Sequence, residues 1–298
     1  MGLGGYWSEV LDVLRDIIPV YDKVNSYISL GKDKEHRLRG IQNRVKSGDV
    51  ILDAGSGFGN MSKTAVEVAG DNISITLYDP LIPMLKNTSK FFDKRPDLSC
   101  GVFEHIPFQN EKFDAVLCGY SLRDAISLKT AISEIHRVLK KEGRFVIVDL
   151  GKPDNAIVRA GVSFYLKLIL PIIALIAGGK LGLKFATLYG TYKLWPQNKK
   201  LEKMLLEKFS RVEFEKELME IAARIELVKD LLDDPKIDEE LARPHLRQEF
   251  EDIHRLKSFL GMEIHGDGMV IYTRPIEHVF AQTGEHSMLS QYKIVLQP

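Results

Sequence analysis

Short apolar runs alternate with stretches of helical spacing through the first half of the chain. The runs predict strands and the stretches between them predict helices. The strands are expected at 50–53, 74–78, 98–103, 113–118 and 144–149, and the helices at 60–68, 82–94 and 128–139. Strands that alternate with helices form a parallel sheet covered on both faces. The pattern therefore predicts an α/β, doubly wound, Rossmann-like fold.

The last of these helices is followed by Lys140, Lys141, Glu142 and Gly143. Lysines complement the partial negative charge at a helix C-terminus, and glycine adopts the left-handed conformation there without steric cost. The sequence therefore predicts that the helix stops at the segment 140–143, with Gly143 as the left-handed terminal residue, and that a strand follows at once.

Helical patterns also precede the first strand. Apolar residues at helical spacing over 10–18 predict an amphipathic helix, and Pro19 interrupts it. A loop and short helix within 21–31 and a basic helix at about 34–45 are expected to follow. Together they predict a group of helices over 1–48 that lies beside the sheet.

The pattern changes after the last predicted strand. Residues 161–183 are mostly apolar, whereas 199–233 and 238–257 are rich in Glu and Lys at helical spacing and predict helices with one solvated face. Alternating residues on either side of Gly266-Asp267-Gly268 predict a hairpin that adds an antiparallel pair to the sheet. Residues 275–298 show no strong period and are expected as a tail.

Composition narrows the classes of partner. The 41 basic and 41 acidic residues cancel, and no basic run suggests a tail for a polyanion, so nucleic acid is not expected as a partner. Cys100 and Cys118 are the only cysteines and lack the spacing of a metal site, so we expect core thiols in a reducing compartment and no metal. The first twenty residues lack the apolar centre of a secretory signal, and a cytoplasmic protein is expected.

One apolar segment bears on membranes. Leu168 to Gly179 is apolar for twelve residues between Lys167 and Lys180. A bilayer span needs about 20 apolar residues, so this segment is expected to be too short to cross. Two interpretations remain open. Residues 164–183 could line a channel for a lipid tail and rest peripherally on the inner face of a membrane, or they could form a buried cap helix or a homodimer contact.

The strongest chemical signal is the segment ILDAGSGFGNMSK at 51–63, in which Gly55, Gly57 and Gly59 follow a strand and precede a helix. Glycine lets the backbone turn sharply and approach a ligand, and amides at a helix start can receive a carboxylate or a phosphate. The loop therefore predicts a ligand of the nucleotide type.

Three features favour S-adenosylmethionine over a dinucleotide. The glycines follow GxGxG rather than GxGxxG. Asp53 precedes them, where it could approach the ammonium group of a methionine moiety, and Asp79 ends the second strand, where a carboxylate can accept from both ribose hydroxyls. The alternative for each acid is a turn former at a strand end. The spacing also disfavours an NAD-dependent oxidoreductase.

Several segments resemble, in order, the motifs of a known family. They are Tyr21-Asp22-x-x-Asn25-x-x-x-Ser29-x-Gly31, the glycine loop, EHIPF at 104–108, SLRD at 121–124 and EIHRVLKKEG at 134–143. Over about 15–155 the chain is similar to the ubiquinone/menaquinone biosynthesis C-methyltransferases. The glycine loop, the Pro-Phe pair and the helix end are typical of class I methyltransferases in general, whereas the first segment and LRD favour the quinone group.

The resemblance implies a mostly parallel seven-stranded sheet and methyl transfer from S-adenosyl-L-methionine to a ring carbon of a prenylated quinol. Such a carbon is a poor nucleophile until a neighbouring hydroxyl is deprotonated, so the site needs a proton acceptor or an anion stabiliser. The resemblance makes Arg123 the candidate for stabilising the phenolate and Tyr21 a lid residue. Asp124 stands where the family usually shows Asn. It could act as the base or pair with Arg123.

A second departure is Val102, where the family often has an acid that accepts from the adenine amino group. Glu104 could substitute for that acid, or Ile106 and Phe108 could hold the adenine by apolar contacts. The predicted cofactor-binding residues are Asp53, Gly55, Ser56, Gly57, Gly59, Asp79, Pro80, Glu104, His105 and Tyr120.

Two other functions stay open. The chain could methylate oxygen or nitrogen of another lipid or small molecule, because the fold and the loop do not fix the acceptor. It could also be a non-catalytic module that keeps the fold for assembly. We expect one domain over 1–298. Its parts are lid helices at 1–48, a cofactor-binding core at 49–150, an apolar acceptor-cap segment at 156–200, a charged helical insertion at 210–258 and a terminal hairpin at 259–275.

Overall fold

The computed structural model describes residues 2–29, 31–88, 92–220 and 272–282. Within these residues, seven strands form one sheet in the order β3-β2-β1-β4-β5-β7-β6. They are β1 (Val50–Ala54), β2 (Ser74–Asp79), β3 (Asp97–Cys100), β4 (Phe113–Gly119), β5 (Leu139–Leu150), β6 (Arg211–Glu220) and β7 (Tyr272–Gln282). β1 to β5 run parallel, and β7 lies antiparallel between β5 and β6. The predicted α/β, doubly wound, mostly parallel fold is confirmed.

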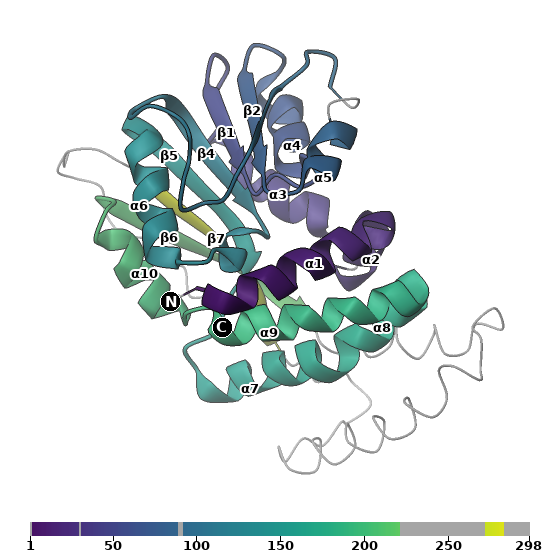
Figure 1. Cartoon of the computed structure of the whole chain (residues 1–298). Coiled ribbons are helices and arrows are strands. Elements are labelled where there is room, and N and C mark those ends of the chain that lie inside the picture. Colours follow the sequence, from purple (N-terminus) through teal and green to yellow (C-terminus); the bar gives the residue numbers. More distant parts are fainter. Residues whose placement is uncertain (1, 30, 89–91, 221–271, 283–298) are drawn as a thin grey trace.

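Helices cover the sheet and build a cap beside it (Figure 1). They are α1 (Trp7–Ile17), α2 (Tyr21–Ile28), α3 (Asp33–Ile41), α4 (Asn60–Ala69), α5 (Ile82–Thr88), α6 (Leu128–Val138), α7 (Ala156–Phe164), α8 (Leu170–Gly178), α9 (Thr187–Leu194) and α10 (Asn198–Leu206). A π-helical turn, Tyr165–Ile169, joins α7 to α8, and a 3₁₀ segment, Gly179–Ala186, joins α8 to α9.

The central strands of the sheet are buried on both faces. Ala115 and Leu117 of β4 pack with α3 and α4, whereas Val116 and Cys118 pack with α6 on the opposite face. All four side chains are fully buried. Because side chains alternate across a strand and helices cover both faces, nearly every central position has to be apolar. This explains the unbroken apolar runs from which the strands are predicted.

The cap has a core of its own. Ile17 of α1 and Val24 of α2 pack with Leu170 and Ile173 of α8, and all are buried. A Cβ at Gly182 would lie 1.7 Å from the carbonyl oxygen of Ala174, so only glycine lets the 3₁₀ segment fold back on α8. The apolar residues of 156–200 therefore bring α1 and α2 over one end of the sheet (Figure 1).

The helix predicted at 128–139 is confirmed to within one residue, but the predicted left-handed terminal residue at Gly143 is wrong. α6 ends at Val138, and Leu139 already has extended backbone and pairs with Phe113 of β4. The ladder is then irregular up to Arg144, and the left-handed residue in this bulge is Glu142, with φ 64°. Gly143 is required for another reason, since a Cβ there would lie 2.7 Å from the carbonyl oxygen of Lys140.

The chain after α10 also differs from its pattern. Helix is predicted over 199–233 and in the insertion 210–258, but 211–220 form strand β6. Pairing with β7, which is distant in sequence, overrides the local helical preference of this charged segment. The helix predicted at 238–257 lies outside the described residues.

β6 and β7 form an antiparallel pair at the edge of the sheet. Of the hairpin predicted at 259–275, residues 272–275 belong to β7 and the rest lie outside the described residues. The predicted turn around Gly266 lies outside the described residues. The expectation that 275–298 is a tail is wrong for residues 276–282, which belong to β7 and pair with 144–150 of β5. The edge of β5 that faces away from β4 is open to a strand from the C-terminal part of the chain. The local sequence pattern of 276–282 does not predict this pairing.

The apolar segment is part of a longer helical run than its twelve residues suggest. Ala156–Leu194 form 39 residues that are long and apolar enough to cross a membrane by length and composition. The expectation that the segment is too short to cross therefore does not hold for the whole run, because α7 and the π-helical turn precede it. Half of its most apolar window is buried inside the protein, as in the core helix of a cap.

Candidate functional site

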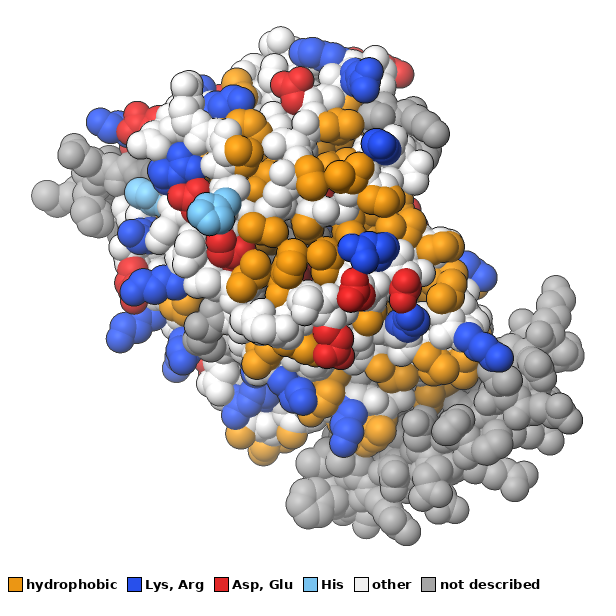
Figure 2. All heavy atoms as spheres, in the orientation of Figure 1, with side chains coloured by type: hydrophobic (Ala, Val, Ile, Leu, Met, Phe, Trp, Pro, Cys, Tyr) orange, Lys and Arg blue, Asp and Glu red, His pale blue; other side chains and the backbone are white. Residues whose placement is uncertain are grey.

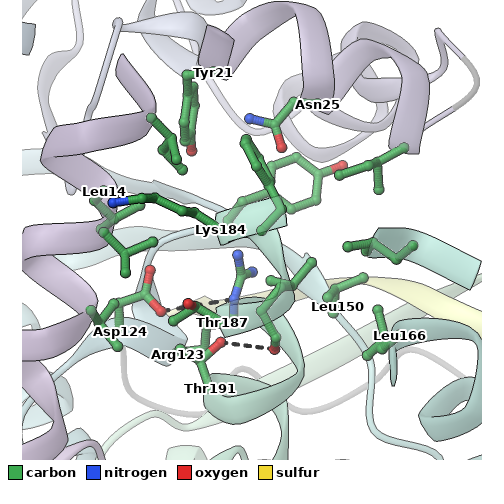
Figure 3. A pocket seen from close by; sticks show the side chains of 18 of the residues that line it. Leu14, Tyr21, Asn25, Arg123, Asp124, Leu150, Leu166, Lys184, Thr187 and Thr191 are labelled. Atoms are coloured by element: carbon green, nitrogen blue, oxygen red, sulfur yellow. Dashed lines mark hydrogen bonds and ion pairs between the residues drawn. The ribbon is translucent and has the colours of Figure 1, made fainter. Parts of the chain in front are cut away.

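Two cavities meet between the sheet and the cap. The loop cavity lies between the glycine loop, the end of β2 and α1. The cap cavity lies between α1, α2, α8 and α9 (Figure 3). The residues that line both cavities are Val10, Leu14, Tyr21, Arg37, Tyr120 and Asp124. Ligands in the two cavities would therefore share these six side chains as contacts.

The glycine loop forms one wall of the loop cavity. Gly55, Gly57 and Gly59 all have left-handed backbone, with φ of 67°, 52° and 68°. A Cβ at Gly55 would lie 2.5 Å from Ser121, and a Cβ at Gly59 would lie 2.6 Å from Thr88, so these two glycines are needed for packing. A Cβ at Gly57 would meet only the sulfur of Met84, at 3.7 Å. Gly57 thus leaves open space for a ligand.

Asp79 and Glu104 line the loop cavity away from the cap. The Oδ2 atom of Asp79 accepts from the amide of Gly57 at 2.8 Å, and Oδ1 accepts from the amide of Leu81 at 2.7 Å. Burial raises the pKa of Asp79 to about 6. Glu104 accepts from the amide of Ser127 through Oε1 at 2.8 Å, while its buried Oε2 has no hydrogen-bond partner. Both acids keep acceptor capacity for a ligand.

Three predicted cofactor contacts lie outside the cavity lining. Asp53 points to the start of α4, where Oδ2 accepts from the hydroxyl and the amide of Ser62 at 2.7 and 3.1 Å. Burial raises the pKa of Asp53 to about 7. Gly59 packs against Thr88. His105 is exposed. We therefore assign Asp53 and Gly59 to the shape of the glycine loop rather than to direct contact, and His105 to the protein surface.

A buried cluster of charges underlies the junction of the cavities. Arg123 in the turn after β4 donates from Nη1 to Oδ1 of Asp149 at the end of β5, and its Nε lies 3.9 Å from Asp124. Burial alone would lower the pKa of Arg123, but Asp149 and Asp124 hold it above its ordinary value. Burial raises the pKa of Asp124 to about 7, against the opposing effect of Arg123. Asp124 is therefore an acid that titrates near neutrality.

Two tyrosines stand between the cavities. Burial raises the pKa of Tyr21 to about 12, and its ring lies 5.9 Å from that of Phe58 in the glycine loop. Tyr120 has left-handed backbone with φ 59°, and its hydroxyl lies 3.0 Å from Nδ1 of His36. Arg37 lies over the Tyr120 ring, 5.2 Å from its centre. A non-glycine residue in this conformation is strained, and such strain is typical of functional sites.

The cap cavity is mostly apolar. Leucines from α1, β5, α8 and the π-helical turn line it, and Asn25 of α2 and Ser29, which follows α2, add polar groups. Figure 3 shows Arg123 and Asp124 together on one side of the cavity, with Leu150 and Leu166 on another. Its charged lining residues, in the described part of the chain, are Asp33, Arg37, Arg123, Asp124 and Lys184. The cavity suits a lipophilic molecule with one polar end.

The structure brings most of the predicted site residues together. Those that line the loop cavity are Tyr21, Gly55, Ser56, Gly57, Asp79, Pro80, Glu104, Tyr120 and Asp124, and Arg123 lines the cap cavity. The sequence analysis did not find Asp149 or Arg37. Asp149 could have been found as an acid that ends a predicted strand, like Asp79. Arg37 carries no such signal, because it lies within a helix of mixed charge.

Comparison with known proteins places this site among methyltransferases. The chain is 30% identical over 167 residues to the demethylmenaquinone methyltransferase of Lactobacillus johnsonii, covering 54% of this chain and 68% of that protein. It is 27% identical over 214 residues to the ubiquinone/menaquinone biosynthesis C-methyltransferase UbiE of Geobacter sulfurreducens, covering 70% and 78%. It is 28% identical over 165 residues to the 2-phytyl-1,4-naphtoquinone methyltransferase of Nostoc punctiforme, covering 53% and 72%.

Solved structures share the fold. The chain matches the phosphoethanolamine N-methyltransferase 2 of Haemonchus contortus with a TM-score of 0.54 and 14% identity, covering 85% of this chain and 52% of that one. It matches the YcgJ protein of Bacillus subtilis with a TM-score of 0.51 and 14% identity, covering 85% and 99%. The model of one methyltransferase family matches residues 6–228, which include every residue of both cavities. The chain therefore belongs to the ubiE/COQ5 methyltransferase family.

Proposed function

We propose that this methyltransferase carries the methyl group of S-adenosylmethionine to a ring carbon of a prenylated quinol or a similar lipophilic aromatic acceptor. The observation that carries the proposal is the junction of the two cavities at Asp124. A polar loop cavity opens there into an apolar cap cavity, next to a carboxyl group that titrates near pH 7. The names of the relatives, which act on menaquinone precursors and a phytyl naphthoquinone, support the same class of acceptor.

The loop cavity fits S-adenosylmethionine in shape and charge. Open space at Gly57 lets backbone approach the ligand, and Asp79 can accept from ribose hydroxyls beside it. The unpartnered Oε2 of Glu104 can accept from the adenine amino group, which answers the absence of an acid at Val102. When bound, this molecule supplies an electrophilic methyl group on a sulfonium.

The cap cavity fits a quinol with an isoprenoid tail. Its apolar walls come from leucines such as Leu150, Leu166 and Leu170, which can pack along a hydrocarbon chain. Its polar end holds Arg123 and Asp124, which can face the hydroxyls of a ring. The ring would then lie at the junction and the tail between the cap helices.

The charge cluster can accept the proton of a ring hydroxyl and stabilise the phenolate that remains. Above its pKa of about 7, Asp124 is a carboxylate that can accept a proton from a ring hydroxyl. Arg123 stays charged and can stabilise the phenolate that results, because its pKa is held above the ordinary value by Asp149 and Asp124. Asp149 keeps the guanidinium in place. Tyr21 and Leu14 cover the junction and exclude water from it.

Product analysis tests the proposal directly. The purified protein is incubated with S-adenosylmethionine and a panel of reduced benzoquinones and naphthoquinones with and without prenyl tails. We expect binding of the donor by calorimetry and a C-methylated prenyl quinol by mass spectrometry and NMR. An O- or N-methylated product would favour the alternative acceptors. Absence of donor binding at millimolar concentration would favour a non-catalytic assembly module.

Gly57 offers a test of the donor site with a matched control. Gly57→Ala and Gly70→Ala both place a methyl group on backbone of positive φ, 52° and 75°. The substitution is expected to destabilise the fold by roughly 1–2 kcal/mol at Gly57 and by more at Gly70, whose ψ of −176° suits glycine alone. Gly70 has nothing within 4 Å and lies outside both cavities. We expect Gly57→Ala alone to weaken S-adenosylmethionine in calorimetry. Equal affinities in the two variants would refute a donor contact at Gly57.

The proton acceptor has a pH signature. Burial raises the pKa of Asp124 to about 7, so the carboxylate is lost as the pH falls through that value. We expect kcat/KM to rise with pH up to about 7 and then level off. Asp124→Asn should lower kcat by about 10²- to 10⁴-fold and remove this inflection.

The matched control is Asp12→Asn, an exposed acid of α1 that pairs with Arg15. It should leave the pH profile as in the wild type. If Asp124→Asn kept the inflection at its wild-type position, another group would be the proton acceptor.

We further propose a peripheral membrane contact through 164–183 that gives a lipophilic acceptor access to the cap cavity. Lys167 and Lys180 are exposed, and Leu183 between Lys180 and Lys184 is 46% exposed. Figure 2 shows hydrophobic side chains mixed with lysines and arginines along the edge where α7 lies. Exposed apolar residues beside cations suit an anionic lipid surface. A homodimer contact is the alternative occupant.

Co-sedimentation with vesicles that contain an anionic lipid tests this contact. We expect the wild type to sediment with the vesicles at low salt and Lys180→Glu to weaken binding by about fivefold or more. Leu206→Ser on α10, where Leu206 is 50% exposed, is the matched control and should bind as the wild type does. A wild type that stays in the supernatant and dimerises in sedimentation velocity would favour the homodimer.

A further inference from the structure

Arg37 has an unusual place in the site. It lies on α3, is only 8% exposed and lines both cavities. Among the described residues that line the loop cavity, the charged ones are Arg37, Asp79, Glu104 and Asp124. Arg37 is thus the one cation in that lining, among three acids. A buried cation that faces a cavity calls for an anion there.

The guanidinium of Arg37 is oriented but not saturated. Its Nη1 donates to Oδ2 of Asp33, one turn earlier on α3, at 2.6 Å. Its plane lies over the ring of Tyr120, which is fixed in turn by the contact of its hydroxyl with His36. In the described part of the chain Nε and Nη2 have no hydrogen-bond partner. Arg37 therefore holds donors in a fixed fork that can bind a carboxylate.

The glycine loop itself has few amides left for an anion. The amides of Gly55 and Ser56 donate to the carbonyl of Tyr78, and that of Gly59 donates to the carbonyl of Ser56. The amide of Gly57 donates to Asp79, and the amide of Ser62 at the start of α4 donates to Asp53. The sequence analysis expected such amides to receive the carboxylate of the ligand. Most of the loop's own donors are instead committed within the protein.

We infer that Arg37 binds the α-carboxylate of the amino-acid moiety of the methyl donor. This inference rests on the proposed function and names a contact that the sequence motifs do not include. S-adenosylmethionine carries one carboxylate besides its ammonium and sulfonium groups. Asp79 and Glu104 can accept hydrogen bonds from the ribose and the adenine of the donor. The amino-acid moiety of the donor then lies toward Tyr120 and Arg37. A carboxylate there would otherwise face Asp124 without a counter-charge.

The rival ligand for Arg37 is the phenolate of the acceptor, because Arg37 also lines the cap cavity. The charges of the two cavities argue against it. The cap cavity has Arg123 and Lys184 as further cations, whereas the loop cavity has Arg37 alone in its described lining. The phenolate of the acceptor can therefore be stabilised by Arg123 and Lys184, whereas Arg37 is the cation available to the carboxylate of the donor in the described lining.

Calorimetry with three ligands tests the inference. The ligands are S-adenosylmethionine, its decarboxylated analogue, and 5′-methylthioadenosine, which lacks the amino-acid moiety. We expect Arg37→Gln to weaken the binding of S-adenosylmethionine by about 10- to 100-fold. This is the range expected when a charge-assisted hydrogen bond to the carboxylate is lost. The decarboxylated analogue and methylthioadenosine should bind the variant and the wild type equally. Arg37→Lys keeps the charge but loses the pair of parallel donors. Its affinity for S-adenosylmethionine should lie between those of the wild type and Arg37→Gln.

Two controls separate this contact from a structural role. Arg39→Gln removes an exposed arginine of the same helix that pairs with Glu35, and it should leave all three affinities unchanged. Unchanged binding of methylthioadenosine by Arg37→Gln shows that the loop cavity is intact. The wild type should also prefer S-adenosylmethionine over the decarboxylated analogue, which requires no substitution.

The outcomes distinguish the inference from the proposed function. Equal loss for S-adenosylmethionine and its decarboxylated analogue in Arg37→Gln would overturn the carboxylate contact. So would unchanged donor affinity with a raised KM for the quinol, which would assign Arg37 to the acceptor. A wild type that binds none of the three ligands would instead overturn the proposed function, and the inference with it.

Discussion

The buried ion pair between Arg123 and Asp149 is the interaction on which the site depends. A guanidinium taken out of water is costly unless a carboxylate compensates it, and Asp149 at the end of β5 does so. Because β4 and β5 are parallel neighbours, their carboxyl ends lie together, and the pair ties the turn after β4 to the end of β5. That turn also carries Asp124. The pairing of two strands thereby fixes the position of Asp124, the proposed proton acceptor, between the two cavities.

The segment that follows β4 holds several parts of the site at once. Next to Arg123 and Asp124, the amide of Ser127 binds Glu104 of the donor side. The carbonyl of Ala125 accepts from the amide of Leu3 at 2.8 Å, which anchors the N-terminal end of the cap next to α1. α1 lines both cavities, so its placement affects donor and acceptor alike. The cap, the donor site and the charge cluster are therefore not independent, since all of them contact one short stretch of chain.

Local patterns account for what the sequence could predict. The strands β1, β2, β4 and β5 are largely apolar because both of their faces are covered. The glycine loop can be recognised in the sequence because its conformation demands glycine. Partners distant in sequence account for what it could not. The strand at 211–220 depends on β7, and the part that Arg37 plays depends on Tyr120, 83 positions later in the chain. His105 lies in a family-like segment, yet the segment exposes it. A motif fixes the course of the backbone more firmly than it fixes which side chains reach the ligand.

Burial determines what a carboxyl group can do at position 124, where the family usually has asparagine, because it raises the pKa of Asp124. An asparagine in this place could hold a hydroxyl or a water but could not take up a proton. A carboxylate in water would be ionised well below neutral pH and would be a weak base. Here burial raises the pKa of Asp124 to about 7, while Arg123 limits the rise. Burial therefore gives the carboxylate the basicity that the proposed removal of a phenolic proton at neutral pH would need.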